Sequence, residues 1–141
     1  MRVFLDSSVL LAASGSPTGA SRAVIALASR RRWTLFSCHY CRTETLRNLP
    51  KVGPQATPAF DTEIEGAIRF VKDRVASENP LVFPISKDRP VVITALAEKC
   101  DVLLTLDRTD FQSQLGGQVY GMLIRTPGDW LEEELGKTRA G

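Results

Sequence analysis

Hydrophobic residues along this chain gather in short runs, separated by longer segments in which they recur every three or four positions. The short runs predict five strands at residues 2–5 (RVFL), 33–37 (WTLFS), 81–84 (LVFP), 102–105 (VLLT) and 119–124 (VYGMLI). Most are apolar throughout, which is typical of strands buried on both faces of a parallel sheet. Strands that alternate with helical segments predict an α/β fold.

The helical segments lie between these runs. Apolar spacing of three and four predicts helices over residues 20–31, 40–49 and 60–75, and a last helix that begins at Pro127. Prolines and a glycine between residues 50 and 58 predict a loop there. In the last helix we expect Trp130, Leu131 and Leu135 to be buried and Gly136 to stop the helix.

Length and composition indicate one globular domain. The chain has 141 residues, of which 43% are hydrophobic and 24% charged, and none of its apolar runs approaches the roughly 20 residues of a membrane-spanning helix. We expect a single domain over residues 1–135 and a frayed tail over 136–141. Asp6 interrupts the apolar N-terminal stretch, which argues against a signal peptide because the apolar core of a signal peptide is uninterrupted. The three cysteines follow no disulfide spacing, which favours a reducing cytoplasm.

The net charge of +2 is small, but its distribution is uneven. Seven basic residues and one acid, Glu44, lie between residues 22 and 51. The basic residues are Arg22, Arg30, Arg31, Arg32, Arg42, Arg47 and Lys51. Such a segment is typical either of a solvated surface or of a nucleic-acid contact, and charge alone leaves both open.

Acidic residues follow three of the predicted strands. Asp6 comes directly after the first strand, Asp107 follows the fourth with one residue between, and Asp88 begins the helix after the third. Ligands of open α/β sheets bind beyond the carboxyl ends of the strands. We therefore expect these three acids at one edge of the sheet.

Glu44 lies within a predicted helix rather than after a strand. Leu46 and Leu49 define the expected buried face of residues 40–49, and Glu44 falls on the opposite side with Tyr40, Arg47 and Lys51. That phase leaves Glu44 able to face a cleft, with Arg47 and Lys51 as candidate phosphate contacts.

Each acid also has a purely structural interpretation. Asp88, Asp107 and Asp6 could each cap the turn or helix that follows them, and Glu44 could pair with Arg47 three residues on. The combination of four acids from distant positions favours a shared site instead. Clustered carboxylates repel one another, whereas Mg²⁺ or Mn²⁺ uses such oxygen ligands and keeps several waters.

Three segments, VFLDSSVLLAA, TETLRNL and KDRPVVITALAEKCDVLLTLDRTDF, resemble the successive motifs of the PIN-domain family. The last is the most specific, because it places Asp88, Asp101, Thr105, Asp107 and Asp110-Phe111 in the family's order. The resemblance covers the chain from Arg2 to about Trp130. It departs from the family at Ser8, where Asn is common, and at the Arg89-Pro90 pair after Asp88.

The resemblance implies a three-layer α/β/α domain with a parallel five-stranded sheet in the order 3-2-1-4-5, which places Asp6 and Asp107 at the topological switch point. It implies that four acids hold one or two Mg²⁺ or Mn²⁺ ions, and that three further residues support them. The acids are Asp6, Glu44, Asp88 and Asp107, and the supporting residues are Ser8, Thr105 and Asp110.

The function implied is that of a metal-dependent endoribonuclease, the dimeric toxin of a type II pair with a small antitoxin. A stand-alone RNA-processing nuclease and a degenerate module that binds RNA or protein remain alternatives.

Other site chemistries fit these residues less well. A haloacid-dehalogenase-like phosphatase needs a second acid where Ser8 stands. A histidine-pair ribonuclease would need more than His39, the single histidine. Cys38, His39 and Cys41 have side chains that can bind zinc. However, a fourth ligand is missing nearby, and side chains this close in sequence are expected to point in different directions.

Overall fold

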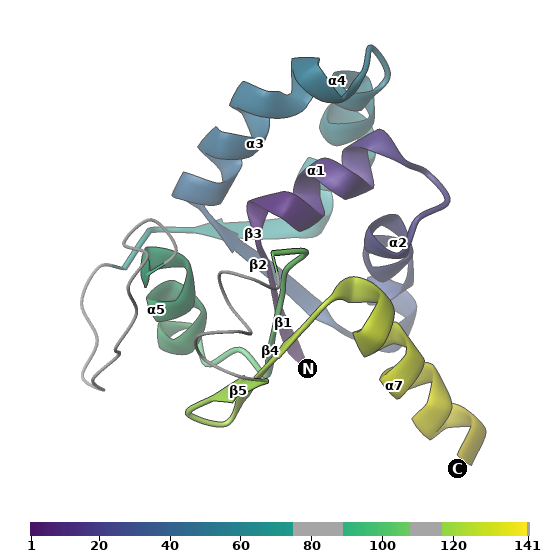
Figure 1. The fold of residues 1–141 in the computed structure, drawn as a ribbon, viewed down its shortest axis with the longest axis vertical. Coiled ribbons are helices and arrows are strands. Elements are labelled where there is room, and N and C mark those ends of the chain that lie inside the picture. Colours follow the sequence, from purple (N-terminus) through teal and green to yellow (C-terminus); the bar gives the residue numbers. More distant parts are fainter. Residues whose placement is uncertain (75–88, 108–116, 141) are drawn as a thin grey trace.

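The computed structural model describes residues 1–74, 89–107 and 117–140, in which strands and helices alternate (Figure 1). The elements in chain order are β1 (Arg2–Leu5), α1 (Ser7–Gly15), α2 (Ala20–Arg31), β2 (Thr34–Cys38), α3 (His39–Val52), α4 (Ala56–Ala59), a π-helical turn (Phe60–Ile64), a 3₁₀ turn (Glu65–Ala67), β3 (Ile68–Val71), α5 (Arg89–Ala97), β4 (Val102–Leu104), β5 (Gln118–Val119), β6 (Met122–Arg125) and α7 (Pro127–Ala140).

The strands form one sheet in the order β3-β2-β1-β4-β6-β5. The pairs β1–β2, β1–β4, β2–β3 and β4–β6 are parallel, and β5 is added antiparallel at the edge beside β6. This confirms the α/β prediction and the order 3-2-1-4, with β6 as the fifth parallel strand. Strands β1 and β4 are neighbours in register, Leu5 opposite Leu104, so Asp6 and Asp107 leave the sheet from adjacent strands.

Helices cover both faces of the sheet, which explains why its central strands are apolar throughout. Helices α1 to α4 and α7 gather on one side and α5 lies on the other (Figure 1). The residues Val3, Phe4 and Leu5 of β1 alternate between the two faces, and all have 0% exposure. The predicted three-layer arrangement follows from burial on both sides.

The third strand is not where the sequence indicated. Residues 60–75 were expected to form one helix, but its middle part, Ile68–Val71, is β3 and pairs with β2 from Leu35 to Cys38. Gly66 weakens a helix just before this point, and the sequence IRFV is rich in strand-forming residues. Pairing with the free edge of β2 therefore makes these four residues a strand and not part of a helix. The predicted strand at 81–84 lies outside the described residues.

Two boundaries also differ. The expected loop from 50 to 58 is shorter than predicted. Helix α3 continues to Val52 with Pro50 inside it, and α4 already begins at Ala56. The strand expected at 119–124 is a hairpin, β5 and β6, whose turn residues Tyr120 and Gly121 have φ of 46° and 84°. Positive φ at both positions is the geometry of a tight two-residue hairpin turn.

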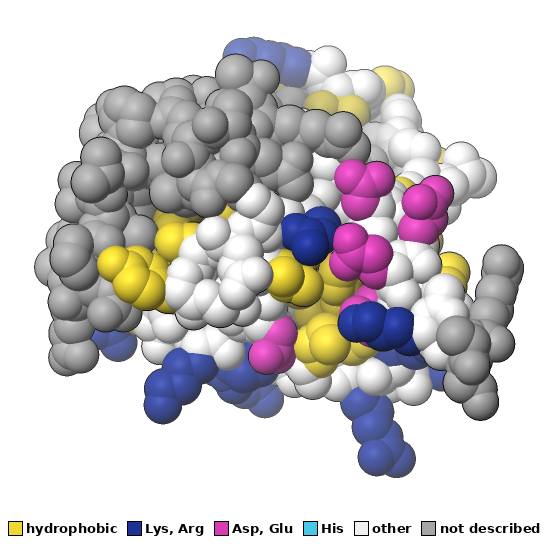
Figure 2. All heavy atoms as spheres, turned by 60° about the horizontal axis from the view of Figure 1, so that its bottom comes forward, with side chains coloured by type: hydrophobic (Ala, Val, Ile, Leu, Met, Phe, Trp, Pro, Cys, Tyr) yellow, Lys and Arg dark blue, Asp and Glu magenta, His cyan; other side chains and the backbone are white. Residues whose placement is uncertain are grey.

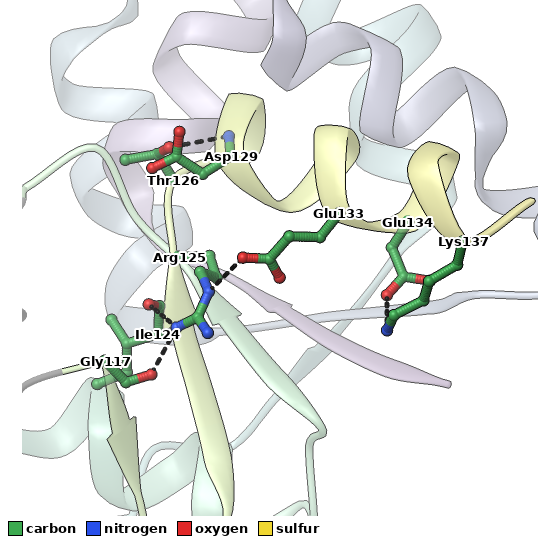
Figure 3. Close-up of polar contacts among 8 residues, drawn as sticks. All are labelled: Gly117, Ile124, Arg125, Thr126, Asp129, Glu133, Glu134 and Lys137. Atoms are coloured by element: carbon green, nitrogen blue, oxygen red, sulfur yellow. Dashed lines mark hydrogen bonds and ion pairs between the residues drawn. The ribbon is translucent and has the colours of Figure 1, made fainter. Parts of the chain in front are cut away.

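Helix α7 is fixed to the body of the protein at its start. Trp130 is buried and its ring lies 4.5 Å from that of Trp33, between α7 and the start of β2. Arg125 of β6 donates to Glu133 of α7 at 2.8 Å, while its Nη1 donates to the carbonyls of Gly117 and Ile124 (Figure 3). These contacts join the last helix to the hairpin edge of the sheet.

The C-terminal part of α7 departs from expectation. Leu131 is buried as predicted, but Leu135 is only half-buried, and the helix continues past Gly136 to Ala140 instead of stopping there. Among the helices of the described segments, none combines the length and apolar character needed to cross a membrane.

Candidate active site

Asp6 stands at the carboxyl end of β1, where the chain turns into α1. Its N–H donates to the carbonyl of Leu104 at 3.0 Å, which continues the pairing of β1 with β4. Its carbonyl accepts from the N–H groups of Val9 and Leu10 and so begins the helix. The Asp6 side chain makes no capping hydrogen bond, so the interpretation of this carboxylate as a simple helix cap is wrong.

Two hydroxyl groups hold the Asp6 carboxylate instead. Ser8 Oγ and Thr105 Oγ1 each donate to Asp6 Oδ2 at 2.9 Å. The same oxygens accept backbone N–H groups, Ser8 Oγ from Leu106 and Thr105 Oγ1 from Asp107, both at 3.0 Å. One small network therefore fixes both Asp6 and the backbone of Asp107.

The environment of Asp6 opposes its negative charge. Asp6 is 7% exposed, and desolvation by burial raises the pKa of its carboxyl group, as does the smaller repulsion from Glu44, while the hydrogen bonds from Thr105 and Ser8 lower it. None of the ion pairs among the described residues involves Asp6. A cation placed beside this carboxylate would relieve the cost of its burial.

Glu44 reaches the same region from α3. Its Oε2 accepts a hydrogen bond from Ser7 Oγ at 3.0 Å, and no ion pair with Arg47 is present among the described residues. The helix buries Cys41, Thr45 and Leu49. Leu46, expected on the buried face, is 37% exposed. The prediction of the buried face was therefore wrong at Leu46, although Glu44 does lie on the cleft side.

Asp6, Glu44 and Asp107 line one open cleft of about 210 Å³. The other lining residues are Ser7, Ser8, Leu11, Tyr40 and Asn48. Across residues 1–74, 89–107 and 117–140, no three His, Cys, Asp or Glu side chains are close enough to bind one ion together. The three carboxylates thus share a cleft without forming a closed ligand set, while Asp88 and Asp110 lie outside the described residues.

Four of the lining residues, Tyr40, Asn48, Ser7 and Leu11, were not anticipated as part of the site. A usable signal exists for the first two, because Tyr40, Glu44 and Asn48 are spaced four residues apart and so share one stripe of α3. Ser7 and Leu11 belong to α1 and have no such signal.

The basic residues between 22 and 51 do not form one surface. Arg22 and Arg42 pair with Glu63 and Glu65, whereas Arg47 and Lys51 are exposed on α3, outside the cleft lining. Residues 30–32 end α2 just before β2 starts, at the amino ends of the strands and away from the cleft. On the face shown in Figure 2, basic side chains are likewise scattered among acidic ones.

The cysteines do not form a zinc site. All three are free and buried, while His39 is exposed, so the side chains of the Cys38-His39-Tyr40-Cys41 segment diverge. Cys41 Sγ lies 4.0 Å from Asp6 Oδ1. A hydrogen bond with Cys38 and burial raise the pKa of the Cys41 thiol, which therefore stays neutral beneath the Asp6 carboxylate.

Comparison with known proteins assigns the family. A family model described as "PIN domain" matches residues 2–109. A solved structure of VapBC2 from Rickettsia felis bound to a DNA fragment from their promoter contains a chain of similar fold, with a TM-score of 0.58, 12% sequence identity and coverage of 89% of this chain and 97% of that chain. None of the curated proteins matches. Since the family model spans well over half of the sequence and includes Asp6, Glu44 and Asp107, this chain belongs to the PIN-domain family.

Proposed function

We propose that this protein is a metal-dependent endoribonuclease whose active site is the cleft of Asp6, Glu44 and Asp107. PIN domains are generally nucleases, and the match over residues 2–109 supports that activity here. The observation that carries the proposal is Asp6, a buried carboxylate held by two hydroxyl groups and directed to a cleft with two further acids.

The donor set fits a hard divalent cation. The acids supply carboxylate oxygens, and no cationic side chain forms an ion pair with Asp6 in the described part of the chain. Mg²⁺ commonly takes one or two carboxylates and fills its remaining positions with water, so a closed cage is not required. Asp6, Glu44 and Asp107 would hold the ion, some directly and others through its bound waters, with Asp88 as the fourth acid. When bound, Mg²⁺ or Mn²⁺ would supply an activated water and would stabilise charge on the scissile phosphate.

The chain's own residues would position these ligands. Ser8 and Thr105 orient the Asp6 carboxylate, Ser7 orients Glu44, and the bond from the Asp107 N–H to Thr105 fixes the start of the loop after β4. Preorganised ligands of this kind lose little entropy when the substrate binds. Arg47 and Lys51 are proposed phosphate contacts at the outer end of α3.

The test is cleavage of single-stranded and structured RNA with Mg²⁺ or Mn²⁺, and with EDTA. We expect Asp6→Asn and Asp107→Asn to reduce cleavage by at least about 10²-fold, because each replaces a carboxyl ligand by an amide. Thr43→Ala is the matched control, since Thr43 is an exposed residue of α3 outside the cleft. Undiminished cleavage by Asp6→Asn, or cleavage that persists in EDTA, would refute the proposal.

We further propose that the nuclease is the dimeric toxin of a toxin–antitoxin pair. The structural similarity to a chain of the VapBC2 complex supports this assignment over a stand-alone RNA-processing enzyme. Induced expression should arrest growth for the natural protein and not for Asp6→Asn, and a small protein encoded beside it should relieve the arrest. Continued growth despite active RNA cleavage would favour the RNA-processing function. Light scattering would test the dimer.

A further inference from the structure

The cleft contains more than the groups that bind a metal. Along α3, Tyr40 lies one turn before Glu44 and Asn48 one turn after it, and all three line the cleft. A rise of 1.5 Å per residue places each about 6 Å along the helix from the acid. An aromatic ring and an amide therefore flank the carboxylate on the same stripe, and Leu11 of α1 adds an apolar wall.

The amide of Asn48 has a defined orientation. Its Nδ2 donates to the carbonyl of Glu44 at 2.8 Å. A carbonyl can only accept, so the nitrogen must point to it and the oxygen must point elsewhere. In the described residues this is the single hydrogen bond of the Asn48 side chain. The half-buried amide thus keeps its oxygen and a second N–H for a ligand in the cleft.

We infer that an RNA strand follows this stripe of α3, with one nucleobase stacked on Tyr40 and the next read by Asn48 as adenine. The inference rests on the proposed function for the identity of the strand. An amide with one acceptor and one donor is the side chain that pairs with the N6 and N7 groups of adenine. Single-stranded RNA presents its unstacked bases to aromatic rings and to such polar groups. The scissile phosphate then lies beside Glu44, between the two bases.

The first experiment is position-resolved cleavage of a randomised single-stranded RNA in Mn²⁺. The natural protein should favour adenine at one position next to the cut, roughly five- to a hundredfold over the other bases. Asn48→Ala should abolish that preference, and Asn48→Asp should turn it towards cytosine, whose N4 group needs an acceptor. Thr43→Ala on the exposed side of α3 should keep the adenine preference.

Tyr40 needs a pair of variants. Tyr40→Ala removes the stacking ring and should raise KM roughly five- to a hundredfold with a smaller effect on kcat, whereas Tyr40→Phe keeps the ring and should raise KM far less. A role of Tyr40 in folding alone would lower the melting temperature of Tyr40→Ala without this KM effect. The inference fails if the natural protein has no base preference beside the cut, or if Asn48→Ala retains it.

A second experiment separates this inference from the nuclease assignment. Uncharged nucleosides avoid repulsion by the three carboxylates, so adenosine, cytidine and uridine can be titrated into ¹⁵N-labelled protein without metal. Adenosine should shift the Asn48 side-chain signals most, and unchanged signals would refute the base-reading role. A response to adenosine without any RNA cleavage in Mn²⁺ would refute the nuclease proposal and leave the adenine site. Cleavage without base preference would do the reverse.

Discussion

At the scale of single residues, the buried Asp6 carboxyl group lowers the stability of the metal-free protein. Because burial raises the pKa of Asp6, the folded protein holds this proton to a higher pH than the unfolded chain does, and stability falls as pH rises between the two values. In the metal-free protein, Asp6→Asn should therefore raise the melting temperature at neutral pH. The two proteins should converge below the unfolded pKa, about 3.9.

The measurement is thermal unfolding against pH in EDTA, followed by titration with Mn²⁺ at pH 7. Metal should stabilise the natural protein through binding to the native state and should stabilise Asp6→Asn much less. If both proteins gained equal stability from Mn²⁺, Asp6 would not be a ligand. Thr43→Ala should follow the natural protein in both titrations.

Thr105 also illustrates how one hydroxyl serves two partners. It donates to Asp6 and accepts from the N–H of Asp107, and its side chain is 1% exposed. Thr105→Val keeps the shape but removes one hydrogen bond from each of the two partners, so we expect a loss of about 1–3 kcal/mol in the free energy of unfolding. Thr105→Ser keeps the hydroxyl and should lose less. Urea denaturation measures both, and equal stability of the valine variant and the natural protein would contradict the network.

At the scale of elements, the two glycines near the C-terminus make a matched pair. Gly136 lies within α7 with open space around it, whereas Gly121 has φ of +84° in the β5–β6 turn. Gly136→Ala should stabilise the protein by up to about 1 kcal/mol, because alanine is the better helix former. Gly121→Ala should destabilise it by about 1–2 kcal/mol, because a Cβ disfavours the left-handed region.

Differential scanning calorimetry of the two variants would measure these opposite shifts. A helix that ended at Gly136, as the sequence suggested, would gain nothing from alanine there.

The third strand also shows that contacts between elements override a local pattern. Residues 60–75 have the apolar spacing of a helix, but pairing of Ile68–Val71 with β2 prevails over that local pattern.

At the scale of the whole molecule, the sheet separates two groups of basic residues that are close in sequence. Arg47 and Lys51 lie on α3, which carries Glu44, whereas Arg30 and Arg32 lie near the amino ends of the strands. The double variant Arg47→Glu with Lys51→Glu should weaken RNA binding. It should also make the slope of log K against log salt concentration shallower, by about 0.7 for each lost phosphate contact. Arg30→Glu with Arg32→Glu makes the same change in charge and should have little effect.

Binding at several salt concentrations would compare the two double variants. Equal losses would indicate that the total charge matters and not its position, which would refute Arg47 and Lys51 as phosphate contacts. A larger loss from the Arg30 and Arg32 pair would place the RNA at the opposite end of the sheet from the cleft.

The sequence by itself determined the fold class, four of the five parallel strands and the positions of Asp6 and Asp107 after strands, because these follow from short-range hydrophobic runs and from general rules of parallel sheets. That these two strands are neighbours was implied by the resemblance to the PIN-domain family, and the pairing of β1 with β4 confirms it. Only the tertiary structure decided the identity of β3, the hairpin at the sheet edge and the residues that share the cleft with the acids. Each of these depends on which surfaces meet: β3 on an open edge of β2, and the lining by Tyr40, Asn48 and Leu11 on the packing of α3 against α1.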